Sequence, residues 1–201
     1  MELVEVRGAS ERDRGRVVAL LTRAFADDAI VRFIFPDDAT YADRAGLFFG
    51  HYFDVRFAGG EITVSGDDVA GASLWTPPGG NRKGKAFVEA HWQRTVVAVL
   101  EPEEIARYEA FRAVLEAMTP REPHWYLGLL GTDPDRRRSG VARALLTPML
   151  ERADRERLPV FLETGMPENL DIYGRFGFEL LREAVVPSGP LVWGMLRTPR
   201  S

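Results

Sequence analysis

Residues Pro134–Leu146 read PDRRRSGVARALL, and this stretch decides the fold. An apolar, strand-like run over 124–130 precedes it, and a helical pattern begins at Gly140. The first turn of a helix has free N–H groups and a partial positive charge, which both favour an anion. Gly140 lets a ligand approach the backbone, and Arg137 and Arg138 offer forked donors suited to phosphate oxygens. We therefore interpret the stretch as a candidate phosphate-binding loop.

The same stretch also fits a solvated basic turn that only caps a helix, because adjacent arginines are commonly exposed. It lacks the Gly-Lys-Ser/Thr of a Walker loop and the three glycines of a dinucleotide-binding fingerprint. The residues of this stretch alone therefore allow two interpretations, an anion-binding site and a simple helix cap.

The segments around the loop alternate between strand-like and helical patterns. We expect helices over 11–27, 41–57, 87–100, 103–118, 140–157 and 169–176, and strands over 3–6, 61–65, 69–76, 124–130, 160–163, 178–186 and 191–196. This order predicts an α/β (α+β) fold, with a mixed, twisted sheet of about six to seven strands and helices on both faces.

The composition is that of a globular protein. The chain has 201 residues, 45% of them hydrophobic and 28% charged, which fits one domain and argues against disorder or a coiled coil. Acidic residues interrupt the first residues, and no apolar run is long enough to span a bilayer, so neither a signal peptide nor membrane association is expected. Cysteine is absent, which removes disulfides and a cysteine nucleophile. We expect a cytoplasmic protein.

Charge and residue spacing exclude several function classes. The net charge of −4 argues against broad nucleic-acid binding, which needs a positive face. His51, His91 and His124 have no metal-ligand spacing, so no metal site is expected. Ser139 has no histidine and aspartate arranged as in a hydrolase triad.

Two motifs together carry a family resemblance. Residues 137–142 (Arg-x-x-Gly-x-Ala) resemble the pyrophosphate loop of the GNAT acetyltransferases, and residues 169–178 (Asn-x-x-x-Tyr-x-x-x-Gly-Phe) look like that family's following helix and turn. They lie 29 residues apart, from Gly140 to Asn169, in the family's order. The resemblance implies the GNAT fold, a V-shaped opening between strands that end near Thr132 and Glu163, and acetyl-CoA as cosubstrate. It implies cofactor binding by Leu130, Thr132, Arg137, Arg138, Ser139, Gly140, Val141, Ala142, Asn169 and Tyr173.

A more specific resemblance links the C-terminal part to the puromycin N-acetyltransferases. Residues 121–127, 161–164 and 186–195 look like corresponding stretches of that group, and Pro148 within a helix fits it too. The resemblance implies a single domain, 1–201, in which residues 122–201 bind acetyl-CoA and residues 1–121 shape the acceptor pocket. The puromycin enzymes have a tyrosine where this chain has Asp28, so puromycin itself is not implied as the acceptor.

Acetyl transfer to an amine needs a base for the amine and an acid for the leaving thiolate. By motif position Tyr173 is the candidate acid, and the alternative is a tyrosine that only packs in the core. Glu163, on a buried strand, is the candidate base or else a hydrogen-bonded structural acid. Asp28 and Tyr126 are candidate substrate-binding residues, although Asp28 also fits a solvent-facing helix end.

We therefore expect an N-acetyltransferase that acts on a primary amine of a small molecule by direct attack, as a monomer or homodimer. Two alternatives stay open. One is a protein acetyltransferase for lysine or an N-terminal amine, which would show an open groove. The other is a non-catalytic acyl-CoA-binding sensor, which would not depend on Tyr173.

Overall fold

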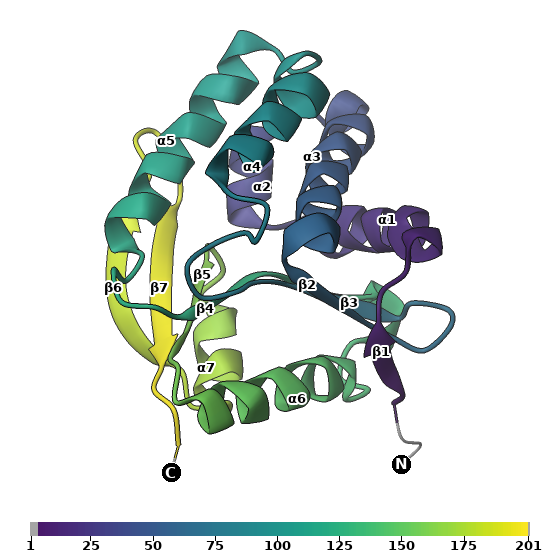
Figure 1. Cartoon of the computed structure of the whole chain (residues 1–201). Coiled ribbons are helices and arrows are strands. Elements are labelled where there is room, and N and C mark those ends of the chain that lie inside the picture. The colour runs from purple at the N-terminus through teal and green to yellow at the C-terminus, as the bar shows by residue number, and fades with distance from the viewer. Residues whose placement is uncertain (1–3, 201) are drawn as a thin grey trace.

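The computed structural model describes residues 4–200 and contains one seven-stranded sheet with helices around it (Figure 1). The strands are β1 (Val6–Gly8), β2 (Glu61–Ser65), β3 (Gly71–Thr76), β4 (Trp125–Thr132), β5 (Val160–Thr164), β6 (Glu179–Val185) and β7 (Leu191–Arg197). The α-helices are α1 (Arg14–Ala24), α2 (Ala29–Ile34), α3 (Asp38–Gly59), α4 (Lys85–Trp92), α5 (Pro102–Met118), α6 (Val141–Glu156) and α7 (Glu168–Gly174). Within residues 4–200, none of the helices is long and apolar enough to cross a bilayer.

The sheet is mixed, as the sequence predicts. The strand order is β1-β2-β3-β4-β5-β7-β6, and every neighbouring pair is antiparallel except β4–β5, which is parallel. Helices α1 and α3 pack on one face and α6 packs on the other (Figure 1). The predicted architecture of six to seven strands with helices on both faces is therefore confirmed.

Strands β4 and β5 separate soon after they begin. Their parallel register covers only Trp125↔Val160 and Tyr126↔Phe161, although β4 continues to Thr132 and β5 to Thr164. Beyond the second pair, the edge of β4 that faces β5 has no strand beside it. The V-shaped opening predicted between these strands is present.

A β-bulge at Gly128 lies at the point where the two strands diverge. Leu74 pairs with Leu129 and Trp75 pairs with Leu127, so Gly128 is an extra residue in β4. An extra residue reverses the alternation of side chains. Leu127 accordingly packs in the core cluster on the α6 face, whereas Leu129 packs in the larger cluster on the α1 and α3 face.

Three elements differ from the sequence-based expectation. The helix expected over 87–100 ends at Trp92 and continues as a π-helical turn, Gln93–Val97, where β-branched residues cluster and the Thr95 hydroxyl bonds the carbonyl of His91. Residues Ala29–Ile34, where the sequence analysis expects neither a helix nor a strand, form α2. The first strand covers Val6–Gly8 rather than 3–6, because its register with β2 begins at Val6, and Leu3 lies outside the described residues.

Candidate active site

The predicted phosphate loop ends at the start of α6. The first helical hydrogen bond runs from the N–H of Ala144 to the carbonyl of Gly140, so the N–H groups of Val141 and Ala142 precede it and point out of the helix end. Gly140 has φ +90°, and a Cβ placed on it would have no atom within 4 Å. Open space therefore lies beside the backbone donors, as an anion site requires.

The loop that leads into α6 is fixed by polar contacts at its base. The Asp133 side chain accepts a hydrogen bond of 3.1 Å from the N–H of Asp135 and forms an ion pair of 2.6 Å with Arg23. Arg137, Arg138 and Ser139 are exposed, so their side chains surround the open space rather than fill it.

The remaining predicted cofactor residues lie along the opening between β4 and β5. Leu130 and Thr132 pair with β3 through Ser73 and Gly71, and their other backbone edge faces the opening. The Asn169 amide donates a hydrogen bond of 2.9 Å to the Thr164 hydroxyl, which joins α7 to the end of β5. An extended ligand arm would thus meet backbone groups of β4 on one side and α7 on the other.

Glu163 is the most perturbed carboxylate of the opening. Its Oε1 accepts a hydrogen bond of 2.8 Å from the Tyr126 hydroxyl, and its Oε2 is buried without a hydrogen-bond partner among the described residues. Burial raises the pKa of Glu163 to about 7. A carboxyl group with this pKa exchanges a proton readily near neutral pH.

Tyr173 lies on α7, with its ring 5.7 Å from the ring of Phe178. Burial raises the pKa of Tyr173 well above its usual value, and the negative charges of Glu163 and Asp28 add to this effect. The phenol is therefore fully protonated at neutral pH. The effect of Glu163 and Asp28 on the pKa of Tyr173 indicates that both carboxyl groups lie near the phenol.

Asp28 has a local structural role that the sequence analysis did not foresee. Its Oδ1 accepts hydrogen bonds of 3.0 Å from the N–H groups of both Ile30 and Val31, so it caps α2. It is half-buried, and this burial raises its pKa despite the two hydrogen bonds. Asp28 therefore stands at a helix end, as one alternative held, but it is half-buried rather than fully solvent-facing, and its charge contributes to the raised pKa values of Glu163 and Tyr173.

Arg56 is a residue of this region that the sequence analysis missed. It projects from α3, is only 4% exposed, and lies over Gly128, where an added Cβ would collide with the guanidinium. Its guanidinium carbon is 4.8 Å from the ring centre of Tyr52 and 5.9 Å from that of Tyr126. In the sequence it is one arginine of a long amphipathic helix, a pattern that normally indicates a solvated charge.

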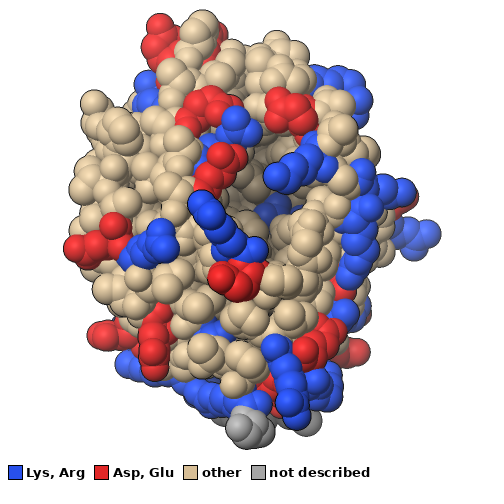
Figure 2. Space-filling view, turned by 60° about the vertical axis from the view of Figure 1, so that its left-hand side comes forward, with Lys and Arg blue, Asp and Glu red and all other residues tan. Residues whose placement is uncertain are grey.

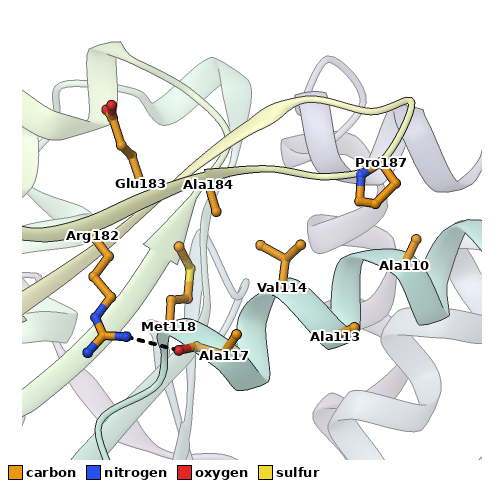
Figure 3. Close-up of a pocket in the computed structure, with 9 residues that line it drawn as sticks. All are labelled: Ala110, Ala113, Val114, Ala117, Met118, Arg182, Glu183, Ala184 and Pro187. Carbon is orange, nitrogen blue, oxygen red and sulfur yellow. Dashed lines mark hydrogen bonds between the residues drawn. The ribbon is translucent and has the colours of Figure 1, made fainter.

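A separate surface hollow of about 450 Å³ lies between α5 and β6 (Figure 3). Its lining is mainly aliphatic, and Arg182 closes one end by donating a hydrogen bond of 3.2 Å to the carbonyl of Ala117. None of its lining residues belongs to the group around Glu163 and Tyr173. We therefore assign the chemistry to the opening between β4 and β5.

Two of the three histidines, His51 and His91, form a buried pair. Nδ1 of His51 lies 2.9 Å from Nδ1 of His91, and Asp54 lies 3.6 Å from Nε2 of His91. Burial and the neighbouring His91 lower the pKa of His51 to about 3. His51 is thus a residue packed in the interior.

This low pKa predicts acid sensitivity. The unfolded chain binds a proton at His51 below about pH 6.5, whereas the folded chain does not until about pH 3, so stability is lost as the pH falls below 6.5. The loss is about 1.4 kcal/mol per pH unit for one such proton. Urea unfolding at pH 7 and pH 5 should show a smaller loss in His51→Asn than in the wild type. An equal loss in both proteins would contradict the assignment.

The comparisons with known proteins agree with the geometry. The profile of the acetyltransferase (GNAT) family matches residues 70–178. An uncharacterised N-acetyltransferase of Schizosaccharomyces pombe is 26% identical over 176 residues, which cover 83% of this chain and 71% of the relative.

Solved structures show the same fold. One is described as histone acetyltransferase HPA2 and related acetyltransferase from Corynebacterium glutamicum, with a TM-score of 0.70, 23% identity, and coverage of 98% of this chain and 97% of that one. Another is arylalkylamine N-acetyltransferase 2 from Aedes aegypti, with a TM-score of 0.66, 15% identity, and coverage of 99% and 100%. The profile match, over more than half of the chain, shows that this protein belongs to the acetyltransferase (GNAT) family, whose reaction is acetyl transfer from acetyl-CoA.

Proposed function

We propose that the protein acetylates a primary amine of a small molecule by direct attack, with Glu163 as general base and Tyr173 as general acid. The observation that carries this proposal is the Glu163 carboxylate at the opening, whose Oε2 has no partner among residues 4–200 and whose pKa is raised to about 7. Bound acetyl-CoA supplies the activated acetyl group.

The geometry supports a site for acetyl-CoA across the opening of the sheet. The N–H groups at the start of α6 and the exposed Arg137 and Arg138 would hold the pyrophosphate, since Gly140 leaves open space there. The free edge of β4 from Leu130 to Thr132 would pair with the extended arm. Ser139, Val141, Ala142 and Asn169 complete this proposed contact surface.

Glu163 and Tyr173 each carry out one of the two proton transfers of the reaction. Glu163 accepts the proton that the amine loses as its nitrogen bonds to the acetyl carbon, and a base with a pKa near 7 suits this task. Tyr173 donates its proton to the sulfur as the carbon–sulfur bond breaks. The low-polarity surroundings that raise the pKa of Tyr173 also raise the pKa of a thiol beside it, so the rise at Tyr173 is offset by a rise at the proton acceptor.

A small acceptor is favoured by the aromatic side chains on the face around Glu163. Tyr52 and Tyr126 approach the site from α3 and β4, and Phe161 stacks on Tyr126 with ring centres 6.0 Å apart. Asp28 and Tyr126 are the proposed substrate-binding residues on this face. The relative named for arylalkylamines fits this proposal, while the relative named for a histone keeps a protein acceptor as the alternative.

We extend the proposal to the organisation of the chain. Residues 122–201 bind acetyl-CoA and residues 1–121 shape the acceptor pocket, within one domain. The puromycin N-acetyltransferase-like group remains the proposed subgroup, on the C-terminal stretches described above. We propose a cytoplasmic enzyme that acts as a monomer or homodimer.

The Tyr173→Phe variant tests the role of the phenol. We expect acetyl-CoA binding within about twofold of the wild type and turnover lowered by about 100-fold, because only the donated proton is removed. The chain has no cysteine, so a thiol reagent detects only the released CoA. Full turnover of the variant would refute the general-acid role, whereas a wild type that binds acetyl-CoA but transfers acetyl to no amine would support the acyl-CoA sensor.

A further inference from the structure

Arg56 is a buried arginine beside the candidate site. Its side chain is 4% exposed, and its Nε is sealed from solvent without an acceptor. In the described part of the chain, its guanidinium contacts Tyr52 and Tyr126 through their ring faces and forms no ion pair. A guanidinium is always charged, and burying it is costly unless an anion or several acceptors compensate.

A second buried arginine shows how this fold normally satisfies such a group. Arg197, which is 3% exposed, forms two parallel hydrogen bonds of 2.7 Å to the carboxylate of Asp154. Arg56 is as deeply buried and has no carboxylate in the same arrangement. The charge of Arg56 lowers the pKa of Glu163, but among residues 4–200 no hydrogen bond joins the two groups, so an acceptor for its Nε can come from a bound ligand.

Arg56 and Glu163 both lie next to Tyr126. The Tyr126 hydroxyl donates to Oε1 of Glu163, and the Tyr126 ring lies 5.9 Å from the Arg56 guanidinium carbon. Each of the two charged groups has a buried atom without a hydrogen-bond partner, Nε of Arg56 and Oε2 of Glu163. Both features lie on the sheet face that carries α3, next to the bulge at Gly128.

We propose that Arg56 binds a carboxylate of the acceptor, so that the acceptor is an amino acid or another small amine that carries a carboxylate. This inference rests on the acetyl transfer proposed above and names the substrate class of the same site. The amine of the acceptor faces Glu163, and its carboxylate faces the planar fork of Arg56, which matches two oxygens at once.

The surroundings of Arg56 indicate which side chain the acceptor carries. Tyr52, Tyr126 and Phe161 form an aromatic wall, which favours an apolar or aromatic side chain. On the side of the molecule with α5 and β6 the surface is also hollowed and bordered by both acidic and basic side chains (Figure 2), but none of these three aromatic residues lines the α5–β6 hollow described above. A simple amine without a carboxylate would leave Arg56 uncompensated, and such a site discriminates against it.

Binding of a carboxylate probe tests this inference independently of turnover. The probe is 3-phenylpropionate, which has the aromatic ring and the carboxylate but no amine. Calorimetric titration is done with the wild type, Arg56→Met, Arg56→Lys and the control Arg155→Met, which removes an exposed arginine at the far end of α6. We expect affinity to fall at least tenfold in Arg56→Met, to recover in part in Arg56→Lys, and to stay unchanged in the control.

Kinetics with matched acceptors give a second readout. L-Phenylalanine and 2-phenylethylamine differ only by the carboxylate, so the ratio of their kcat/KM values isolates its contribution. We expect the wild type to favour phenylalanine by about tenfold or more, and Arg56→Met to lower this ratio by at least tenfold. Far-ultraviolet circular dichroism confirms that each variant is folded.

The outcomes separate this inference from the proposed function. Lack of acetyl transfer to either amine, together with Arg56-dependent binding of 3-phenylpropionate, would overturn the proposed function and keep the carboxylate site. Lack of probe binding by the wild type would overturn the carboxylate site. Equal losses for phenylalanine and 2-phenylethylamine in Arg56→Met would assign Arg56 a purely structural role.

Discussion

Gly140→Glu is expected to abolish acetyl-CoA binding. Gly140 has φ +90° at the start of α6, and a side chain there would enter the open space in front of the helical N–H groups. A carboxylate in that space would repel a pyrophosphate and would accept the same backbone hydrogen bonds. Calorimetric titration of acetyl-CoA should show an affinity lower by more than about 100-fold than in the wild type, which corresponds to about 2.7 kcal/mol.

Gly140→Gln is the matched control, because glutamine has the shape of glutamate and strains the positive φ of this position equally. The difference between the two variants reports the effect of charge alone. We expect the glutamine variant to bind at least tenfold more tightly than the glutamate variant. Equal affinity of both would show that backbone strain, rather than an anion site, explains the loss. Unchanged acetyl-CoA binding in both variants would show that the loop before α6 only caps this helix and does not bind the pyrophosphate.

The fold was largely predictable because its strongest signals are local. Turn residues separate the runs that became β2 and β3, and Gly140 and Gly177 mark positions with positive φ that a side chain would strain. The π-helical turn after Trp92 was not predictable in the same way. The Thr95 hydroxyl bonds the carbonyl of His91 there, but Thr147 makes the same bond to Arg143 inside the regular helix α6, so no local pattern distinguishes the turn.

The candidate site was predictable only where a motif marked it. The backbone donors of α6 and the position of Tyr173 follow from short sequence patterns, whereas the function of Arg56 depends on contacts between distant segments. Arg56 precedes Gly128 by 72 residues and is buried only because that glycine leaves room for it. The bulge at Gly128 also decides that Tyr126 and Leu129 face α3, and no alternation pattern in the sequence shows it.

Glu163→Gln is expected to lower kcat by about 100-fold or more, since glutamine keeps the shape of the side chain but cannot accept the proton of the amine. The pKa of Glu163 is about 7, so the wild-type kcat/KM should rise as the pH increases through 7 and the carboxylate forms. The variant should lack this inflection. The rate profile is measured between pH 5.5 and 8.5 with one acceptor amine, through the thiol released from acetyl-CoA.

Tyr126→Phe is the matched control for this profile. The Tyr126 hydrogen bond lowers the pKa of Glu163, so its removal should shift the inflection to higher pH without abolishing it.

Stability provides a check on the role of Glu163 that is independent of turnover. The raised pKa means that folding disfavours charged Glu163, so the wild type loses stability as the pH rises from about 4.5 through 7, and Glu163→Gln does not. The variant should therefore resist urea better than the wild type above pH 7. A variant with this higher stability and undiminished kcat would assign Glu163 a structural role and require another base.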